Sequence, residues 1–176
     1  MNLVTNGGFE SGFASWTYSG TPGTADIGTG FPHSGTNHAA FGEYPGFGNL
    51  SQTLTTSIGE SYTLSFWLFH PVSPAQFGQT PNGFNVSWNG STLSSFTLTD
   101  AGPFAYTNFT VSGLVATSTS TTLQFGFSHR PNYWVLDDVS VTAGPLNATG
   151  VPDSGFTWVL FAVGLAALAM IRRRIS

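Results

Sequence analysis

Apolar and polar residues alternate along much of the first 143 residues, and this period of two predicts β-strands. Residues 62–69 show it most clearly: alternate side chains from Tyr62 to Leu68 share one apolar face, while Trp67 and Phe69 lie on the other. Three further sets are each predicted to share a strand face: Thr107, Phe109 and Val111; Leu123, Phe125 and Phe127; and Val135, Val139 and Val141. These patterns favour an extended structure throughout the region.

A β-hairpin is predicted in the middle of this region. Residues 84–88 alternate, and they are followed by Asn89-Gly90, the dipeptide preferred in a two-residue type I′ turn, and by a return strand over 91–98. No window between residues 1 and 145 carries an apolar stripe at helical spacing. Frequent glycine and proline divide the region into about eight to ten short strands. We therefore expect an all-β fold, a β-sandwich with a core rich in phenylalanine.

The C-terminal residues break this pattern. Residues 156–171 form an uncharged apolar run. As a helix this run is roughly 24 Å long, whereas the hydrocarbon core of a bilayer is ~30 Å thick, so we predict a marginal transmembrane helix. Such a helix suits a segment that is processed, and the alternative is an ordinary membrane anchor. The chain thus divides into a β-sandwich (1–143), a flexible linker (144–150) and a tail (151–176), whose basic end is Arg172, Arg173 and Arg174.

The three arginines predict an orientation in the membrane. Cationic residues beside a membrane segment stay in the cytoplasm, so residues 1–150 are expected outside it. Export requires a signal peptide, yet the chain opens at Met1 with neither the basic region nor the apolar region that such peptides have. We therefore expect the signal peptide to be missing from this chain. The rival is a tail-anchored cytoplasmic protein, which the position of the arginines disfavours.

Charge and cysteine content exclude several partners. The chain has no cysteine, so it holds no disulfide and no thiolate metal site. It also lacks lysine, and residues 1–150 carry one arginine, Arg130, against seven carboxylates. Such a domain offers no cationic surface for phosphate backbones, which excludes nucleic acid as a partner. Its polar residues are mostly uncharged, a composition common in proteins that contact glycans or lie in an extracellular matrix.

The C-terminal tail resembles a known class of bacterial sorting signals. Its motif is Val151-Pro152-Asp153-Ser154-Gly155, followed by the apolar run and the three arginines. This order is similar to the PEP-CTERM signals, in their VPDSG variant. The more usual core of the class is Val-Pro-Glu-Pro, so Asp153 keeps the carboxylate while the second proline is missing. The resemblance implies that a membrane-embedded exosortase recognises the tail, cleaves it and delivers the domain to the cell surface or extracellular polymer.

Three segments of the domain resemble galactose-binding-like jelly-roll domains, among them several families of carbohydrate-binding modules. These segments are Leu3–Glu10 with the nearby Trp16, Tyr62–Trp67, and Leu136–Val141. The resemblance covers nearly the whole domain and implies a jelly-roll β-sandwich that binds glycans.

The same resemblance implies a structural calcium ion where the first and last strands meet. Calcium prefers carboxylate and carbonyl oxygens, and the candidate ligands are Glu10, Asp137 and Asp138. Alternation predicts that Asp137 faces inward with Val135 and the later valines, while Asp138 faces outward. A carboxylate directed toward a core must be paired or bind a metal ion, which makes Asp137 the preferred ligand. The alternative is that Asp137 accepts hydrogen bonds from amides of the first strand, with no metal.

Glycan binding would use the faces of aromatic rings. Most large aromatic side chains of a sandwich belong to its core, so only some are available. Candidates are Trp67 and Trp88, on strands that could line a concave face, and Tyr133 and Trp134, beside Arg130.

The sequence offers little that suggests catalysis. Its four histidines lack metal-binding spacing, Gly-x-Ser-x-Gly is absent, and a phosphate loop needs a lysine that the chain lacks. A pair of carboxylates acting as in glycosidases is the remaining route to an enzyme. We expect a non-catalytic exported protein that binds carbohydrate. The alternatives are a structural matrix protein without a defined ligand and an uncleaved, membrane-anchored β domain.

Overall fold

The computed structural model describes residues 1–71, 81–129 and 132–144. Met1–Leu146 form one compact unit. The described residues contain ten strands: β1 (Thr17–Ser19), β2 (Ala25–Gly28), β3 (His38–Phe41), β4 (Gly48–Thr55), β5 (Ser61–His70), β6 (Gly83–Trp88), β7 (Ser91–Thr99), β8 (Phe104–Val115), β9 (Ser120–Ser128) and β10 (Trp134–Ala143).

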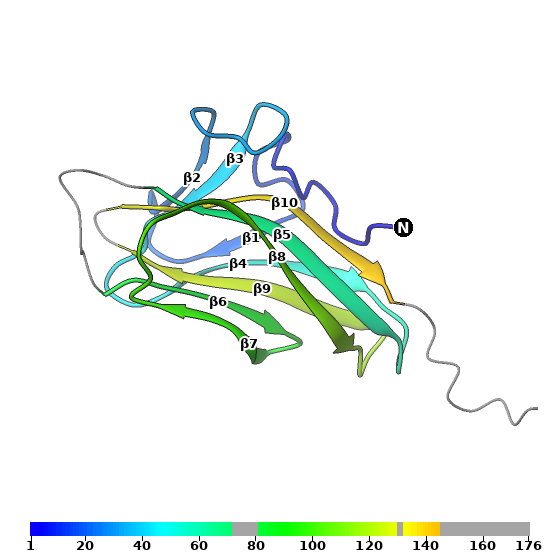
Figure 1. Cartoon of the computed structure of the whole chain (residues 1–176). Coiled ribbons are helices and arrows are strands. Elements are labelled where there is room, and N and C mark those ends of the chain that lie inside the picture. Colours follow the sequence, from blue (N-terminus) through cyan, green and yellow to red (C-terminus); the bar gives the residue numbers. More distant parts are fainter. Residues whose placement is uncertain (72–80, 130–131, 145–176) are drawn as a thin grey trace, which may run out of the picture. The chain divides into compact units, whose positions relative to one another are not determined.

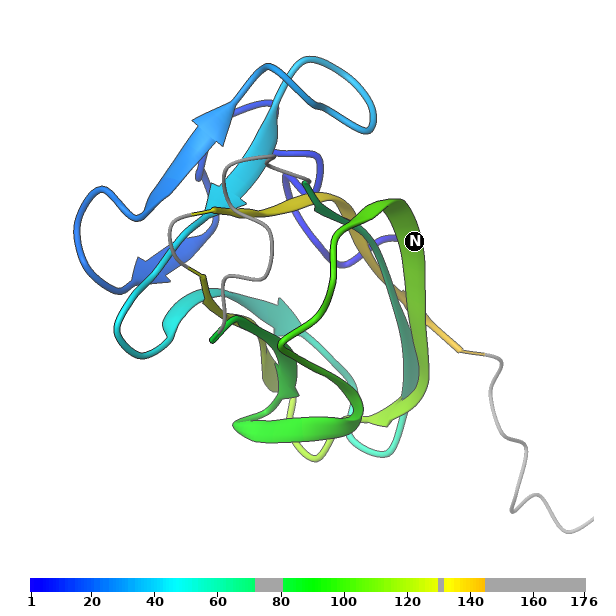
Figure 2. The same ribbon diagram turned by 60° about the vertical axis from the view of Figure 1, so that its left-hand side comes forward.

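The strands form two antiparallel five-stranded sheets that face each other (Figures 1 and 2). One sheet has the order β1-β4-β9-β6-β7 and the other the order β2-β3-β10-β5-β8. The predicted all-β sandwich is therefore confirmed for the described part of the chain. The described part of the chain contains no helix that is long and apolar enough to span a bilayer. The predicted linker from residue 145 onward, the sorting motif, the apolar helix and the three arginines lie outside the described residues.

The core between the sheets is built largely from aromatic rings. Phe66 of β5 lies at its centre, with ring centroids 5.0 Å from Phe96, 5.3 Å from Phe125 and 6.2 Å from Phe84. The predicted apolar face of β5 is buried, as expected, and Trp67 lies on the opposite face. Every core residue in the described part of the chain lies between residues 4 and 141. The unit Met1–Leu146 thus contains its own core, and we expect it to fold by itself.

The predicted hairpin joins β6 to β7. Asn89 and Gly90 have φ angles of 50° and 81°, and Trp88 pairs with Ser91 across the turn. Two consecutive residues with positive φ define a type I′ turn, so the prediction from Asn89-Gly90 is confirmed.

The predicted alternation along β10, in which Asp137 faces the core together with Val139 and Val141, is wrong because a β-bulge interrupts the strand. Trp134 and Leu136 point into the core before the bulge, and Val139 and Val141 do so after it. Between them the pairing with β5 shifts register, and Asp138 adopts a φ of 48°. An extra residue reverses the alternation. Asp137 therefore shares a face with Val135 but lies opposite Val139 and Val141, on the outer side of its sheet.

The N-terminal segment runs beside β10 as irregular chain rather than as a regular strand. Leu3 N donates to Val141 O at 2.8 Å, and Val139 N donates to Gly7 O at 3.0 Å. A β-carbon at position 7 would stand only 2.0 Å from Val139 O, so this close approach requires glycine. The first and last parts of the domain are thus adjacent, as the resemblance implied.

Candidate functional site

The outer face of the β1-β4-β9-β6-β7 sheet is polar and uncharged. Its strands pair residue for residue, except for a register shift between β6 and β7 from Asn85 to Ser87, and so align their outward side chains in transverse rows. One row consists of Ser19, Asn49, Gly126, Asn85 and Thr97, and the next of Thr17, Ser51, Gln124, Ser87 and Thr92. No charged residue occurs in either row, so hydroxyl and amide groups dominate this face.

The amides gather around a glycine at the centre of this face. Asn85 Oδ1 lies 2.7 Å from the point where a β-carbon of Gly126 would stand, so the Asn85 amide lies over bare backbone. On the other side of Gly126, Asn49 Oδ1 accepts a hydrogen bond of 3.1 Å from Gln124 Nε2. All three amide side chains are half-buried. Because each primary amide has donors and acceptors, the cluster can bind a hydroxyl group in either role.

An exposed aromatic ring lies beside these amides. Phe47 immediately precedes β4 and is 52% exposed. Its ring edge lies 2.6 Å from the point where a β-carbon of Gly83 would stand, and Gly83 is the next outward position to Asn85 on β6. The missing side chain at Gly83 therefore lets the ring lie on the sheet. We name Phe47, Asn49, Asn85, Gln124 and Gly126 the amide face.

Two of the aromatic candidates lie in the core. Trp88 is 6% exposed, with its indole N–H donating to Val115 O at 3.0 Å. Trp134 is fully buried, with its indole N–H donating to Ser128 O at 3.2 Å. Trp134 therefore has no ring face open to a sugar, and Trp88 exposes only a small part of its ring, at the wall of a surface cavity that Leu93 also lines.

The other two candidates lie apart from the amide face. Trp67 is half-buried on the outer face of the opposite sheet, and the His33 ring stacks on it at 3.8 Å between centroids. Tyr133 is 49% exposed and packs over Gly42. The structure thus does not bring the four candidates together. Asn49, Asn85 and Gln124 were missed because they appear in the sequence only as polar members of alternating strands.

The predicted calcium ligands surround the loop of residues 33–37. Asp137 is fully buried, and its Oδ2 accepts hydrogen bonds from His33 N at 2.8 Å and Ser34 N at 3.3 Å. Its Oδ1 accepts from Asp138 N at 2.7 Å. Burial raises the pKa of Asp137, and these amides partly offset that rise. The carboxylate thus accepts backbone amides, as the alternative to metal binding proposed, but most come from this loop rather than from the first strand.

Glu10 and Asp138 bind the same loop. Glu10 Oε1 accepts from Thr36 N and Asn37 N at 2.9 and 3.0 Å. Asp138 uses both oxygens, one 2.6 Å from His33 Nδ1 and the other accepting from Ser34 Oγ. In the described part of the chain, no three His, Asp or Glu side chains form a group able to hold a metal ion. Both oxygens of Asp137 and both of Asp138 thus already take part in these contacts, so Glu10 Oε2 is the carboxylate oxygen left for calcium, and carbonyls or waters would have to complete the shell.

A buried carboxylate lies near the start of the amide face. Glu43 is 3% exposed and accepts hydrogen bonds from the hydroxyls of Tyr18, Thr21 and Thr24 and from Thr21 N, at 2.6 to 2.9 Å. Burial alone would raise its pKa, but these four donors outweigh burial and hold the pKa at about 2. The carboxylate therefore stays ionised and ties β1 and the following turn to the end of β3.

A buried histidine pair lies against Trp134. His70 Nε2 and His129 Nε2 are 2.6 Å apart, and His70 Nδ1 lies 3.0 Å from Gly102 O. A carbonyl only accepts, so His70 carries its proton on Nδ1 and accepts at Nε2 from His129. His129 Nδ1 is buried without a hydrogen-bond partner. Burial lowers the pKa of both rings, and the neighbouring His70 helps lower that of His129 to about 4.

Solved structures of carbohydrate-binding modules share this fold. TmCBM61 in complex with β-1,4-galactotriose has a TM-score of 0.63 and 19% identity, covering 82% of this chain and 99% of that one. The CBM22-1 xylan-binding domain from Paenibacillus barcinonensis Xyn10C has a TM-score of 0.56 and 15% identity, and the match covers 81% of this chain and 94% of that domain. A Family 16 Carbohydrate Binding Module-2 has a TM-score of 0.55 and 15% identity, and the match covers 80% of this chain and 99% of that module. The described domain therefore has the jelly-roll sandwich fold of these structures.

The tail is assigned separately from the domain. Residues 150–175 match the VPDSG-CTERM motif, which confirms the predicted sorting signal and implies an exported protein. No curated protein matches the chain in sequence.

Proposed function

We propose that this exported protein binds an uncharged polysaccharide through the amide face of its jelly-roll domain. The observation that carries the proposal is the transverse row in which Asn49 and Asn85 flank Gly126, with the exposed ring of Phe47 beside them. A sugar ring stacks on an aromatic face through its C–H groups, while its hydroxyls need donors and acceptors at fixed positions. The amide face has both elements within one surface.

The lack of charge on this face supports a neutral ligand. An anionic glycan would favour arginine or lysine, and the sheet's outer rows contain neither. The comparisons support the same class of ligand, since one neighbour is described with galactotriose and another as xylan-binding. The three similar structures carry the names of binding modules or of a binding domain, which favours binding without turnover.

The sorting signal supports a proposal about location. We infer that an exosortase recognises Val151–Gly155, that residues 156–171 cross the membrane before processing, and that the domain reaches the surface or extracellular polymer. Glycan binding would then retain the released domain in that polymer. A matrix protein without a defined ligand is the second candidate, supported by the hydroxyl-rich surface.

Retention on insoluble glycans tests the binding proposal. Residues 1–146 are incubated with a panel of neutral and acidic insoluble polysaccharides, and bound and free protein are separated by centrifugation. We expect retention on at least one neutral glycan. The Phe47→Ala and Asn85→Ala variants should each weaken it about tenfold, the effect of losing one good contact.

Asn108→Ala is the matched control. Asn108 is an exposed amide on β8, in the opposite sheet, so its removal should leave retention unchanged. The absence of retention on every glycan would favour the matrix protein. Retention that survives Asn85→Ala and Phe47→Ala would exclude the amide face as the site.

A further inference from the structure

The two sides of the sandwich differ in their edge strands (Figure 2). On one side, β1 and β2 have only three and four residues, and β2 carries Asp26. On the other side, β7 and β8 have nine and twelve residues and no charged residue. Natural sheets protect their edges with short strands, charges, prolines or bulges. The β7 and β8 side has neither short strands nor charges.

β7 is protected by an irregularity. Thr97 pairs with Asn85 and Thr92 pairs with Ser87, so the four residues between Thr92 and Thr97 stand opposite one residue of β6. Such a bulge distorts the edge and prevents regular pairing with another strand. The unprotected edge is therefore that of β8.

The centre of β8 is regular. Thr107–Val111 pair residue for residue with β5, and the register shifts occur only beyond the two ends of this segment. At about 3.3 Å per residue the segment is roughly 17 Å long. Three of its five residues, Thr107, Thr110 and Val111, are β-branched, which favours the extended conformation. No strand in the described part of the chain pairs with its other edge.

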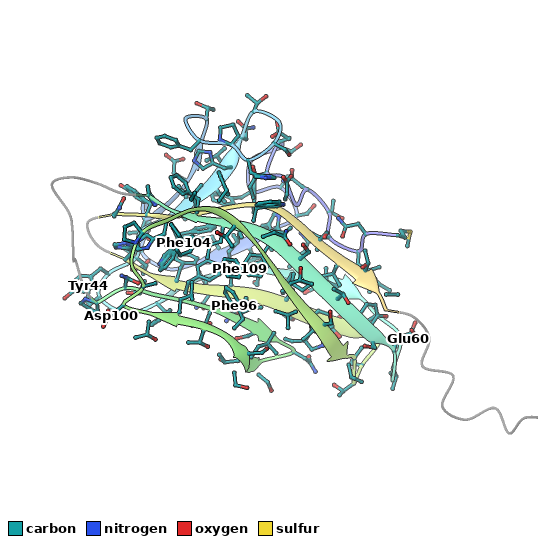
Figure 3. All side chains as sticks on the ribbon, in the orientation of Figure 1. Tyr44, Glu60, Phe96, Asp100, Phe104 and Phe109 are labelled. Atoms are coloured by element: carbon teal, nitrogen blue, oxygen red, sulfur yellow. The ribbon has the colours of Figure 1, made fainter. Side chains whose placement is uncertain are left out.

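An aromatic side chain lies partly open at this edge. Phe109 packs on Phe96, Phe66 and Phe104, with ring centroids 4.8, 5.8 and 6.0 Å away. Figure 3 labels Phe109, Phe96 and Phe104. Phe109 remains partly exposed. A further strand beside β8 would cover this ring as well as supply hydrogen bonds to the free backbone edge.

We propose that Thr107–Val111 pair antiparallel with the same segment of a second copy of this chain. The two β2-β3-β10-β5-β8 sheets would then join into one continuous sheet across a two-fold axis near Phe109. A second copy is the occupant that fits, because an antiparallel strand is complementary to itself about such an axis. The uncharged segment also places no like charges opposite each other. This pairing does not depend on glycan binding.

Sedimentation velocity of residues 1–146, over concentrations up to about 1 mM, tests the pairing. We expect a reversible, concentration-dependent dimer. The Thr110→Lys variant adds two like charges beside the two-fold axis and should weaken the dimer at least about tenfold. A wild-type domain that stays monomeric over this range overturns the proposal, as does a dimer that Thr110→Lys leaves intact.

Thr142→Lys is the control for the added charge. Thr142 is exposed on the same sheet but lies on β10, which pairs with β5 at this position. Equal weakening by both variants would show that charge in general, rather than the β8 edge, opposes association. Thermal melts confirm folding, and Asn108→Lys serves as a second edge variant if Thr110→Lys is unfolded. Glycan retention of Thr110→Lys should be unchanged.

Discussion

The amide oxygen of Asn85 lies over the bare backbone of Gly126, 2.7 Å from the point where a β-carbon would stand. Asn85 belongs to β6 and Gly126 to β9, and the two residues are register partners in the same row. A side chain at 126 would displace this amide and fill the space between Asn85 and Asn49. The proposed site therefore depends on the absence of a side chain at one position.

Gly126→Ala should weaken glycan retention by about tenfold or more, because the methyl group moves the Asn85 amide away from its position. The fold should tolerate the change, since the obstructing atoms belong to a side-chain end rather than to backbone. Gly102→Ala is the control, because nothing lies within 4 Å of its β-carbon position. Unchanged retention in Gly126→Ala would contradict the geometry assigned to the site.

The buried histidine pair should make the domain less stable in mild acid. The pKa of His129 is about 4 in the folded domain and 6.5 in the unfolded chain, so the unfolded state binds more protons between these values. Stability is thus full above about pH 6.5 and falls as the pH approaches 4, by about 3 kcal/mol in all. Urea unfolding between pH 7.5 and 4 measures this, and His129→Gln should flatten the dependence. A profile equally steep in the variant would exclude the pair as its cause.

The contribution of Glu43 to the stability of the domain should depend on pH in a lower range than that of the histidine pair. Its pKa of about 2 lies below the ordinary 4.5, so its contribution is complete above pH 4.5 and is lost as the pH falls toward 2. Glu43→Gln replaces an acceptor of four hydrogen bonds and should cost about 2 kcal/mol at pH 7. Chemical unfolding of Glu43→Gln measures this cost. Asp26→Asn, at an exposed carboxylate, should cost little, and equal losses in the two variants would contradict this role.

Calcium should raise the melting temperature of residues 1–146 if it binds at Glu10 and Asp137. The gain grows with the logarithm of the ion concentration, as for any ligand of the folded state. Glu10→Gln should abolish the gain while the domain stays folded, because Glu10 is exposed. Asp26→Asn is again the control. Unchanged melting in the presence of calcium would mean that the backbone amides of residues 33–37 suffice for these carboxylates.

Processing of the tail is tested on the protein from its native cells. Mass spectrometry of surface and medium fractions should find a C-terminus near Val151–Gly155, since the VPDSG-CTERM match covers residues 150–175. An intact chain ending at Ser176 in the membrane fraction would instead indicate an uncleaved anchor.

The period of two in the sequence was sufficient to predict the all-β class, the faces of β5 and β9 and the turn at Asn89-Gly90. It was not sufficient for β10, because a single bulged residue at Asp138 reverses which side chains face the core. The aromatic candidates show a second limit. Trp88 and Trp134 are as large as any ligand-binding aromatic, and only their partners across the sandwich place them in the core. The row of Asn49, Gly126 and Asn85 depends on pairing between strands far apart in the sequence, which local patterns do not contain.

The most direct test of the central claim is an NMR titration of residues 1–146 with a soluble oligosaccharide of the retained glycan. Side-chain amide resonances report on Asn49, Asn85 and Gln124 in the amide face and on Asn108 in the opposite sheet. We predict that the first three shift with a common saturation curve while Asn108 does not move. Shifts that centre on Asn108 and Trp67, with the amide face unchanged, would contradict the proposed site.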